Sequence, residues 1–136
     1  MLNRLTPKKI VVVSSAPQIR YPDCYGIDMA IMGDLIAFRA AISLFKKTFK
    51  VDALKEIYKK CVQENKKKTT QIRNVVKEVY NPFTDDQISK EISRMLKDKD
   101  IDSDVEVVFQ SIDNLHKACP NHLGDWYFSG DYPTPG

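Results

Sequence analysis

Hydrophobic residues follow two different spacings along this chain, and these spacings predict strands near the ends with helices between them. From Lys9 to Ser15 the sequence contains an unbroken β-branched run, Ile10 to Val13, which predicts a strand. An unbroken apolar run is typical of a strand that is covered on both faces of a parallel sheet. A second short strand is predicted from Val105 to Phe109. Because the segment between the strands supplies the long crossover that parallel pairing requires, we predict that they pair in parallel.

Four segments between these strands carry apolar residues at the three- and four-residue spacing of one helix face. The first helix is predicted from about Met32 to Lys47, and the third ends at Asn81-Pro82 because the residue before a proline disfavours helix. The apolar positions of the four segments are, in order, Leu35, Phe38, Ile42 and Phe45; Leu54, Ile57, Tyr58, Cys61 and Val62; Ile72, Val75, Val76, Val79 and Tyr80; and Ile88, Ile92, Met95 and Leu96.

Polar residues mark the starts of two predicted helices. Thr84 and Gln87 have the spacing of a capping box, and Phe83 with Ile88 can form the accompanying hydrophobic staple. Ser111 is placed to cap a brief helix that follows the second strand. Two strands alone make a marginal sheet, so we expect a mostly helical α/β piece that completes a larger parallel sheet.

Composition places the chain among ordinary globular proteins. It has 136 residues, of which 43% are hydrophobic and 29% are charged, which fits one domain with room for an inserted subdomain. No apolar stretch approaches the roughly 20 residues needed to cross a bilayer, and no signal peptide is evident. The net charge is only +3, and the lysine cluster at 66–68 lacks interleaved aromatic residues. We therefore expect a cytoplasmic protein that binds neither nucleic acid nor membrane.

Common catalytic motifs are missing from the sequence. It contains no phosphate-binding Gly-x-x-x-x-Gly-Lys loop, no Gly-x-Gly-x-x-Gly, no Gly-x-Ser-x-Gly and no His-Glu-x-x-His. Cys119 could form a nucleophilic pair with His116 or His122, but nothing in the sequence supplies a third, orienting group. An odd number of cysteines, three, argues against a disulfide framework, and Cys61 is expected to pack in the core.

One constellation has the residue types of a metal site. Cys119-Pro120-Asn121-His122 is a Cys-x-x-His step, and Cys24 lies far upstream. Two ligands at this spacing can reach one metal ion because a tight turn brings both side chains to the same side. A specific metal site needs four well-spaced ligands, so the alternative is that these residues are buried or partly buried without a metal.

The stretch from Ile10 to Asp28 resembles part of the glutamine-dependent amidophosphoribosyltransferases that open purine biosynthesis. In that family a strand ending in small residues and proline leads to an Ile-Arg-Tyr/Phe-Pro step and then Tyr-Gly-Ile-Asp, as at residues 19–22 and 25–28 here. Leu35-Ile36-Ala37 also matches the family. The tail, Phe128 to Thr134, resembles the family's aromatic-x-Gly-x-Tyr-Pro ending.

The resemblance implies a parent enzyme with two activities. A glutaminase domain releases ammonia through its terminal cysteine. A phosphoribosyltransferase domain, with Mg²⁺, passes that ammonia to 5-phosphoribosyl-1-pyrophosphate and gives phosphoribosylamine in de novo purine biosynthesis. The parent is then a cytoplasmic glycosyltransferase and a homo-oligomer, and the partners of this chain are its glutaminase and phosphoribosyltransferase core. The family's pyrophosphate-sugar motif would lie before Met1, so the 136-residue chain alone is expected to hold no catalytic residue and to be inactive.

The resemblance also divides the chain. Residues 1–50 correspond to the C-terminal part of a phosphoribosyltransferase-like domain and contribute to its parallel sheet. Residues 51–104 match no part of the family and are interpreted as a helical insertion. Residues 105–136 are expected to form a strand, a short helix and an aromatic tail that return to the parent domain.

One branch of the family holds an iron–sulfur cluster through a cysteine in a Pro-Cys-x-x-Gly-Ile turn and a late Cys-x-x-Cys. Here Cys24 stands one place later than in that turn, and the second late cysteine is replaced by His122. We predict that Cys24, Cys119 and His122 lie near one another as the remnant of an iron–sulfur or zinc site, without a bound cluster. The alternative functions are a stand-alone metal-binding or protein-interaction module related to that enzyme and, less well supported, a basic helical nucleic-acid binder.

Overall fold

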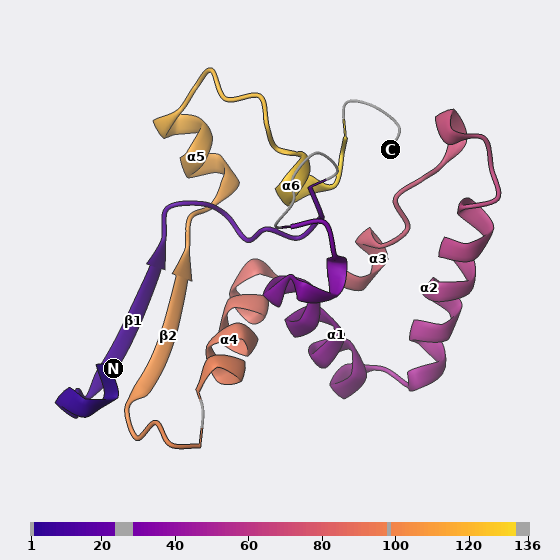
Figure 1. Cartoon of the computed structure of the whole chain (residues 1–136). Coiled ribbons are helices and arrows are strands. Elements are labelled where there is room, and N and C mark those ends of the chain that lie inside the picture. The colour runs from indigo at the N-terminus through magenta and orange to yellow at the C-terminus, as the bar shows by residue number, and fades with distance from the viewer. Residues whose placement is uncertain (1, 24–28, 98, 133–136) are drawn as a thin grey trace.

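The computed structural model describes residues 2–23, 29–97 and 99–132, and it is a mixed α/β structure that is about half helical (Figure 1). Two strands near the ends of the chain enclose most of the helices. The elements, in chain order, are η1 (Leu2–Leu5), β1 (Lys9–Ser14), η2 (Met32–Asp34), α1 (Ile36–Thr48), α2 (Val51–Glu64), η3 (Thr69–Gln71), α3 (Lys77–Tyr80), α4 (Asp85–Leu96), β2 (Asp104–Phe109), α5 (Ile112–Ala118) and α6 (Trp126–Ser129), where η denotes a 3-10 helix.

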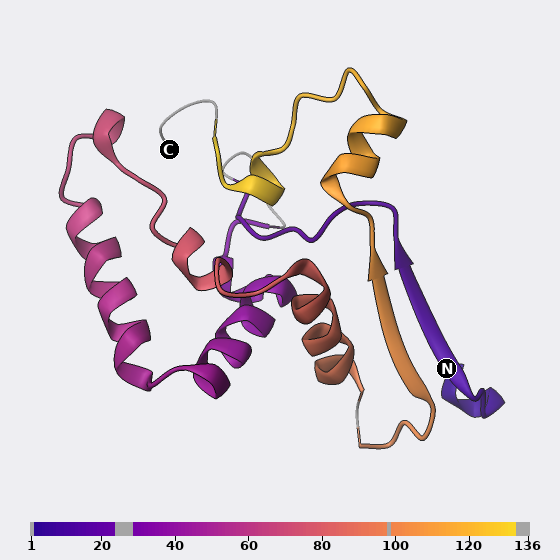
Figure 2. The ribbon, with the colours of Figure 1, turned by 180° about the vertical axis from the view of Figure 1, so that it is seen from behind.

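The two strands pair in parallel, as their spacing predicts. Lys9 lies opposite Asp104, and Ser14 lies opposite Phe109, so the pairing runs along the full length of both strands. Both views of the ribbon show β1 and β2 side by side at one end of the molecule, with α4 next to β2 (Figures 1 and 2). Within the described residues the sheet has only these two strands.

Only one face of this sheet is well covered. Val107 of β2 is buried and belongs to the same core as α4, and its neighbours along the chain, Glu106 and Val108, are exposed. In β1, however, Val11 and Val13 are 50% and 72% exposed. The expectation that this strand is covered on both faces is therefore wrong for this chain. The reason is that β1 is an edge strand and no described element packs on the far face.

The core lies between α1, α4 and the covered face of the sheet. Helix α1 approaches α4 closely because three of its inward positions are alanines, Ala37, Ala40 and Ala41, each at most 2% exposed. On α4, Ile88 and Ile92 are the largest fully buried side chains. The remaining buried apolar residues of the core are Tyr21, Phe45, Ile57, Val79, Tyr80 and Val107.

Helix α4 begins where the sequence predicts. The amide of Gln87 donates to Thr84 Oγ1 at 3.2 Å, and the Thr84 amide donates to Gln87 Oε1 at 2.9 Å, which completes the capping box. Two of the free amides at the helix start are satisfied in this way. The predicted stripe is confirmed at Ile88, Ile92 and Met95, but Leu96 is 44% exposed because it lies at the end of the helix.

Two other helices differ from their predicted extents. A short 3-10 turn precedes α1, which begins at Ile36 rather than Met32. The predicted helix from Ile72 to Tyr80 is reduced to α3, Lys77–Tyr80. Ile72 is extended, and the amide of Arg73 donates to the Glu64 carboxylate at 3.0 Å instead of to a helical carbonyl. The four β-branched residues of this segment, Ile72, Val75, Val76 and Val79, lower its helix propensity further.

A buried carboxylate joins α1 to α4. Glu91 is only 6% exposed and accepts hydrogen bonds from Arg94 Nη2 at 2.7 Å, Lys47 Nζ at 2.8 Å and Ser43 Oγ at 2.7 Å. The pKa of Glu91 is lowered to about 2, and the hydrogen bond from Arg94 is the largest cause. Burial alone would raise this pKa, but the hydrogen bonds from Arg94 and Lys47 outweigh that effect. Glu91 is therefore ionised at neutral pH and holds the two helices together.

Helix α2 stands to one side of this core. Ile57 is its buried residue, whereas Tyr58 and Val62 are 70% and 40% exposed. The helix leads into the exposed lysine turn at 66–68, where Lys67 pairs with Glu64, as expected of a solvated turn. Among the described residues, no helix is both long enough and apolar enough to cross a membrane.

Candidate functional site

The loop that follows β1 is the first part of the candidate site, because parallel α/β sheets bind ligands beyond the carboxyl ends of their strands. The strand ends in a tight turn in which Ser14 Oγ donates to the carbonyl of Ala16 at 2.9 Å. Pro17 and Gln18, which come next, are buried. The loop therefore turns inward after the strand and runs over the start of α4.

Gln18 anchors this loop to α4. Its side chain is 4% exposed, and Nε2 donates to the Asp85 carbonyl and to Ser89 Oγ, both at 2.8 Å. Its Oε1 accepts from Arg20 Nη2 at 2.8 Å. Arg20 also forms an ion pair with the Asp85 carboxylate. All the hydrogen-bonding capacity of a buried amide is thus used to hold the loop on the helix start.

Tyr80 holds the same loop from the side of α3. Its hydroxyl donates to the Arg20 carbonyl at 2.7 Å, and the Arg20 guanidinium lies 5.3 Å from the centre of its ring. Burial raises the pKa of Tyr21 to about 12 and raises the pKa of Tyr80 as well. Both phenols therefore stay protonated at neutral pH, so they serve as hydrogen-bond donors or packing groups and not as bases.

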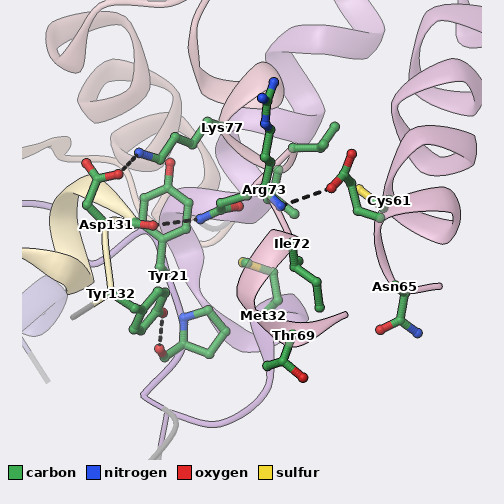
Figure 3. Close-up of a pocket in the computed structure, with 16 residues that line it drawn as sticks. Tyr21, Met32, Cys61, Asn65, Thr69, Ile72, Arg73, Lys77, Asp131 and Tyr132 are labelled. Atoms are coloured by element: carbon green, nitrogen blue, oxygen red, sulfur yellow. Dashed lines mark hydrogen bonds and ion pairs between the residues drawn. The ribbon is translucent and has the colours of Figure 1, made fainter. Parts of the chain in front are cut away.

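The C-terminal tail crosses the loop on its outer side. The carbonyl of Tyr127 accepts from the amides of Arg20 and Tyr21 at 2.9 and 3.1 Å. The Tyr132 hydroxyl donates to the carbonyl of Pro22 (Figure 3). The loop is consequently fixed by α4 and α3 on one side and by the tail on the other.

The tail is also fixed to the segment that contains α3. Lys77 forms an ion pair with Asp131, and Asn74 Nδ2 donates to the Gly130 carbonyl at 3.1 Å (Figure 3). Gly130 has a φ of +73°, and a Cβ there would lie 2.6 Å from Asn74 Nδ2 and 2.8 Å from the Tyr21 ring. Only glycine fits this position without moving its neighbours.

A cavity of about 830 Å³ opens beside this tail. Figure 3 shows Tyr21 and Tyr132 on one side of it, Cys61 and Asn65 on the other, and Met32 beside Ile72 between them. The thiol of Cys61, at the edge of the cavity, is half-buried, and burial raises its pKa. The expectation that Cys61 packs against the core is confirmed.

The Cys-x-x-His step lies on one turn after α5. The His122 amide donates to the Cys119 carbonyl at 3.0 Å, but the Cys119 residue itself is exposed. Asp125 lies between two imidazoles: His116 Nε2 is 2.6 Å from Oδ2, and His122 Nε2 is 2.9 Å from Oδ1. The second contact lacks hydrogen-bond geometry, so His122 Nε2 and Asp125 Oδ1 are buried without a hydrogen-bond partner.

These contacts bear on the predicted site residues in different ways. The structure places Cys119 and His122 on the same turn, whereas Cys24 lies outside the described residues, so the predicted three-residue site stays a prediction. Over residues 2–23, 29–97 and 99–132, no group of three or more metal-ligating side chains could hold a metal ion. A nucleophilic Cys119–His116 pair would need a third group that orients the imidazole, and the sequence did not reveal one. In the structure the carboxylate of Asp125 contacts the His116 imidazole. No sulfur-to-imidazole hydrogen bond of Cys119 occurs in the described part of the chain.

Two curated proteins match a 47-residue stretch of this chain. One, from Pasteurella multocida, is 47% identical over that stretch, and the other, from Haemophilus influenzae, is 45% identical. Both carry the name amidophosphoribosyltransferase. The chain contains a stretch similar to this enzyme. The resemblance predicted from the sequence is confirmed over that length.

The similarity to amidophosphoribosyltransferase covers 35% of this chain and only 9% of each relative, so the chain spans a small part of the proteins it matches. No protein-family model matches the chain, and no solved structure gives a significant match. Within the stretch from Ile10 to Asp28 that resembles the family, Gln18 and Arg20 carry the hydrogen bonds to α4. No sequence signal pointed to α4 as their partner, because the two segments are more than 60 positions apart.

Proposed function

We propose that this chain is part of an enzyme related to amidophosphoribosyltransferase. The parent enzyme transfers ammonia, released from glutamine, to 5-phosphoribosyl-1-pyrophosphate and forms phosphoribosylamine for purine biosynthesis. The observation that carries this proposal is the 47-residue stretch, which is 45–47% identical to two such enzymes. In the proposal, residues 1–50 and 105–136 belong to the phosphoribosyltransferase domain, and residues 51–104 are a helical insertion in it.

The exposed edge of the sheet supports this placement in a larger domain. Val11, Val12 and Val13 are 50%, 47% and 72% exposed on the outer strand of a two-stranded sheet. Stable proteins protect such an edge with charges, prolines or a covering element, because its free backbone groups and apolar side chains recruit other strands. Lys9 supplies the charge in β1, and it is paired with Glu106. A further parallel strand of the parent enzyme on this edge would pair with the free backbone groups of β1 and extend the sheet.

The loop after β1 supports a role beside the catalytic centre. It lies beyond the carboxyl end of the strand, and Gln18, Arg20 and Tyr80 hold it rigidly. In the proposed enzyme this loop forms one wall of the phosphoribosyl site, and the rest of the parent chain supplies the catalytic groups and holds Mg²⁺. The side chains of the loop are used in structural hydrogen bonds, so we assign them a positioning role and no catalytic one.

The remnant metal site is part of the same proposal. Cys119 and His122 share a turn, which agrees with the retained half of a former cluster site. Anaerobically purified protein is expected to contain neither iron nor acid-labile sulfide and to show no visible absorption. Stoichiometric iron and sulfide would contradict the loss of the cluster, but they would leave the assignment to the enzyme family intact.

The decisive experiment is to sequence the coding region upstream of Met1 and to assay both proteins. The proposal expects an open frame encoding a hydrophobic strand, paired acidic residues and a Gly-Thr-Thr turn. The longer protein should form phosphoribosylamine with ammonia, Mg²⁺ and 5-phosphoribosyl-1-pyrophosphate, and the 136-residue chain should not. An in-frame stop directly before Met1 would overturn the proposal in favour of a stand-alone module. Turnover by the 136-residue chain would overturn the part of the proposal that places the catalytic groups outside it.

A further inference from the structure

The cavity beside the tail does not include Gln18 or Arg20, the side chains that hold the loop after β1 on α4. It lies between parts of the chain that are distant in sequence: the α2–η3 region on one side, and Tyr21, Pro22 and the tail on the other (Figure 3). Its volume of about 830 Å³ is within the range of small-molecule sites. A molecule bound there would contact both parts at once.

The walls of the cavity are mainly aromatic and aliphatic. Tyr21 and Tyr132 are held in place by their neighbours, the first by burial and the second by its hydrogen bond to Pro22. Met32 supplies a flexible apolar surface and Ile72 an aliphatic one, and the two side chains lie next to each other in Figure 3. Fixed aromatic rings and an adaptable methionine favour a flat apolar ligand.

Three of the four charged side chains that line the cavity are already paired. Lys77 forms an ion pair with Asp131, and Glu64 pairs with Lys67 and accepts from the Arg73 amide. The fourth, Arg73, forms no ion pair within the described residues, but in Figure 3 its side chain extends away from Met32 and Thr69. A charged ligand held between Met32, Ile72 and Tyr132 would therefore lose its hydration without a free counter-charge beside it, which disfavours it.

Two neutral polar groups remain available. Asn65 and Thr69 line the cavity, and within the described residues neither side chain hydrogen-bonds to another protein group. We propose that this cavity binds an uncharged, flat, largely apolar small molecule, whose one polar edge hydrogen-bonds to Asn65 or Thr69 while its ring lies between Met32, Ile72 and Tyr132. This site goes beyond the proposed function: it shares Tyr21 and Pro22 with the loop after β1, but it involves neither Gln18 nor Arg20.

Indole is a suitable probe because it is flat, uncharged and has one N–H. In protein labelled with ¹³C at the methionine methyl groups, indole should shift the Met32 resonance saturably through its ring current. Met95, which packs in the core, should not shift and is the internal control. The Met32 resonance is identified by its absence in Met32→Leu. No saturable shift of Met32 at indole concentrations up to about 5 mM would overturn the proposal.

Matched variants test the position and the ligand class. Ile72→Ala should raise the Kd for indole about fivefold, because it removes apolar contact surface in the cavity. Val62→Ala is the control, since Val62 is exposed to a similar extent, 40% against 43%, but does not line the cavity. Equal losses in both variants would overturn the assigned position. Tighter binding of indole-3-acetate than of indole would overturn the uncharged ligand class.

Discussion

The hydroxyl of Tyr80 donates a hydrogen bond of 2.7 Å to the backbone carbonyl of Arg20, a residue 60 positions earlier in the chain. The Arg20 guanidinium, in turn, lies over the Tyr80 ring. Two different interactions thus join the same pair of residues. The conformation of the loop after β1 therefore depends on α3. A substitution in either segment should change the stability of the other.

Tyr80→Phe tests this link. The substitution removes the hydroxyl and leaves the Arg20 carbonyl without its protein donor, so we expect the free energy of unfolding to fall by about 1 kcal/mol. Urea unfolding followed by circular dichroism measures the change. Tyr58→Phe is the control and should have no effect, because Tyr58 is 70% exposed. Equal stability of Tyr80→Phe and the wild-type protein would show that the hydrogen bond contributes nothing.

Glu91→Gln should show a pH-dependent loss of stability. Folding lowers the pKa of Glu91 from 4.5 to about 2, so the folded state binds fewer protons than the unfolded state between these values. The stabilisation is therefore complete above pH 4.5 and is lost as the pH falls toward 2. At pH 7 the variant should be less stable by about 2 to 3 kcal/mol.

Denaturant unfolding of both proteins between pH 7 and pH 2 measures this difference. The gap between them should narrow below pH 4.5, since the protonated carboxyl no longer differs in charge from the amide. Glu56→Gln is the matched control, because Glu56 is 63% exposed and pairs only with Lys59. A gap that stays constant across the pH range would mean that the ionised form of Glu91 is not what stabilises the fold.

Thr84→Ala removes the hydroxyl that accepts from the Gln87 amide at the start of α4. The loss of such a cap costs about 1 kcal/mol. The midpoint of thermal or urea unfolding should fall accordingly. Thr70→Ala, in the exposed 3-10 turn η3, provides no cap and should leave the midpoint unchanged. If both variants behave alike, the capping box does not contribute to stability.

Gly130→Ala tests the close approach of the tail to Asn74 and Tyr21. The added Cβ would clash with both side chains, and alanine tolerates the positive φ poorly, so we expect a loss of about 2 kcal/mol. Gly33→Ala is the control, because a Cβ added at Gly33 would have nothing within 4 Å. Unfolding by urea compares the two, and an unchanged stability of Gly130→Ala would show that the tail does not pack as described.

The sequence predicted those features that depend on local spacing. The capping residues Thr84 and Gln87 identified the start of α4 correctly, and the parallel pairing of the strands followed from the long crossover between them. The predicted helix from Ile72 to Tyr80 is wrong over its first part, because the spacing of apolar residues does not show which acceptor a backbone amide uses. Here the amide of Arg73 uses the Glu64 carboxylate.

The candidate site was predicted less completely than the fold. The sequence identified Cys119 and His122 as neighbours on a turn, but it did not reveal that Asp125 would lie between His122 and His116. The sequence showed only that Arg20 belongs to the family's Ile-Arg-Tyr/Phe-Pro step and that Gln18 precedes this step. Their bonds to α4 depend on tertiary packing between distant segments, which no local pattern encodes.

The pairing of β1 with β2 has a consequence for the order of folding during synthesis. Lys9 and Asp104 are paired although they are 95 positions apart, so β1 leaves the ribosome long before its partner exists. At a synthesis rate of about 5–20 residues per second, β2 is made roughly 5–20 s after β1, and the valines of β1 have no pairing strand during that time. Loop closure over such a distance also makes this pairing a late step. A nascent chain arrested after α3 should therefore expose β1 to chaperones, whereas one extended past β2 should release it.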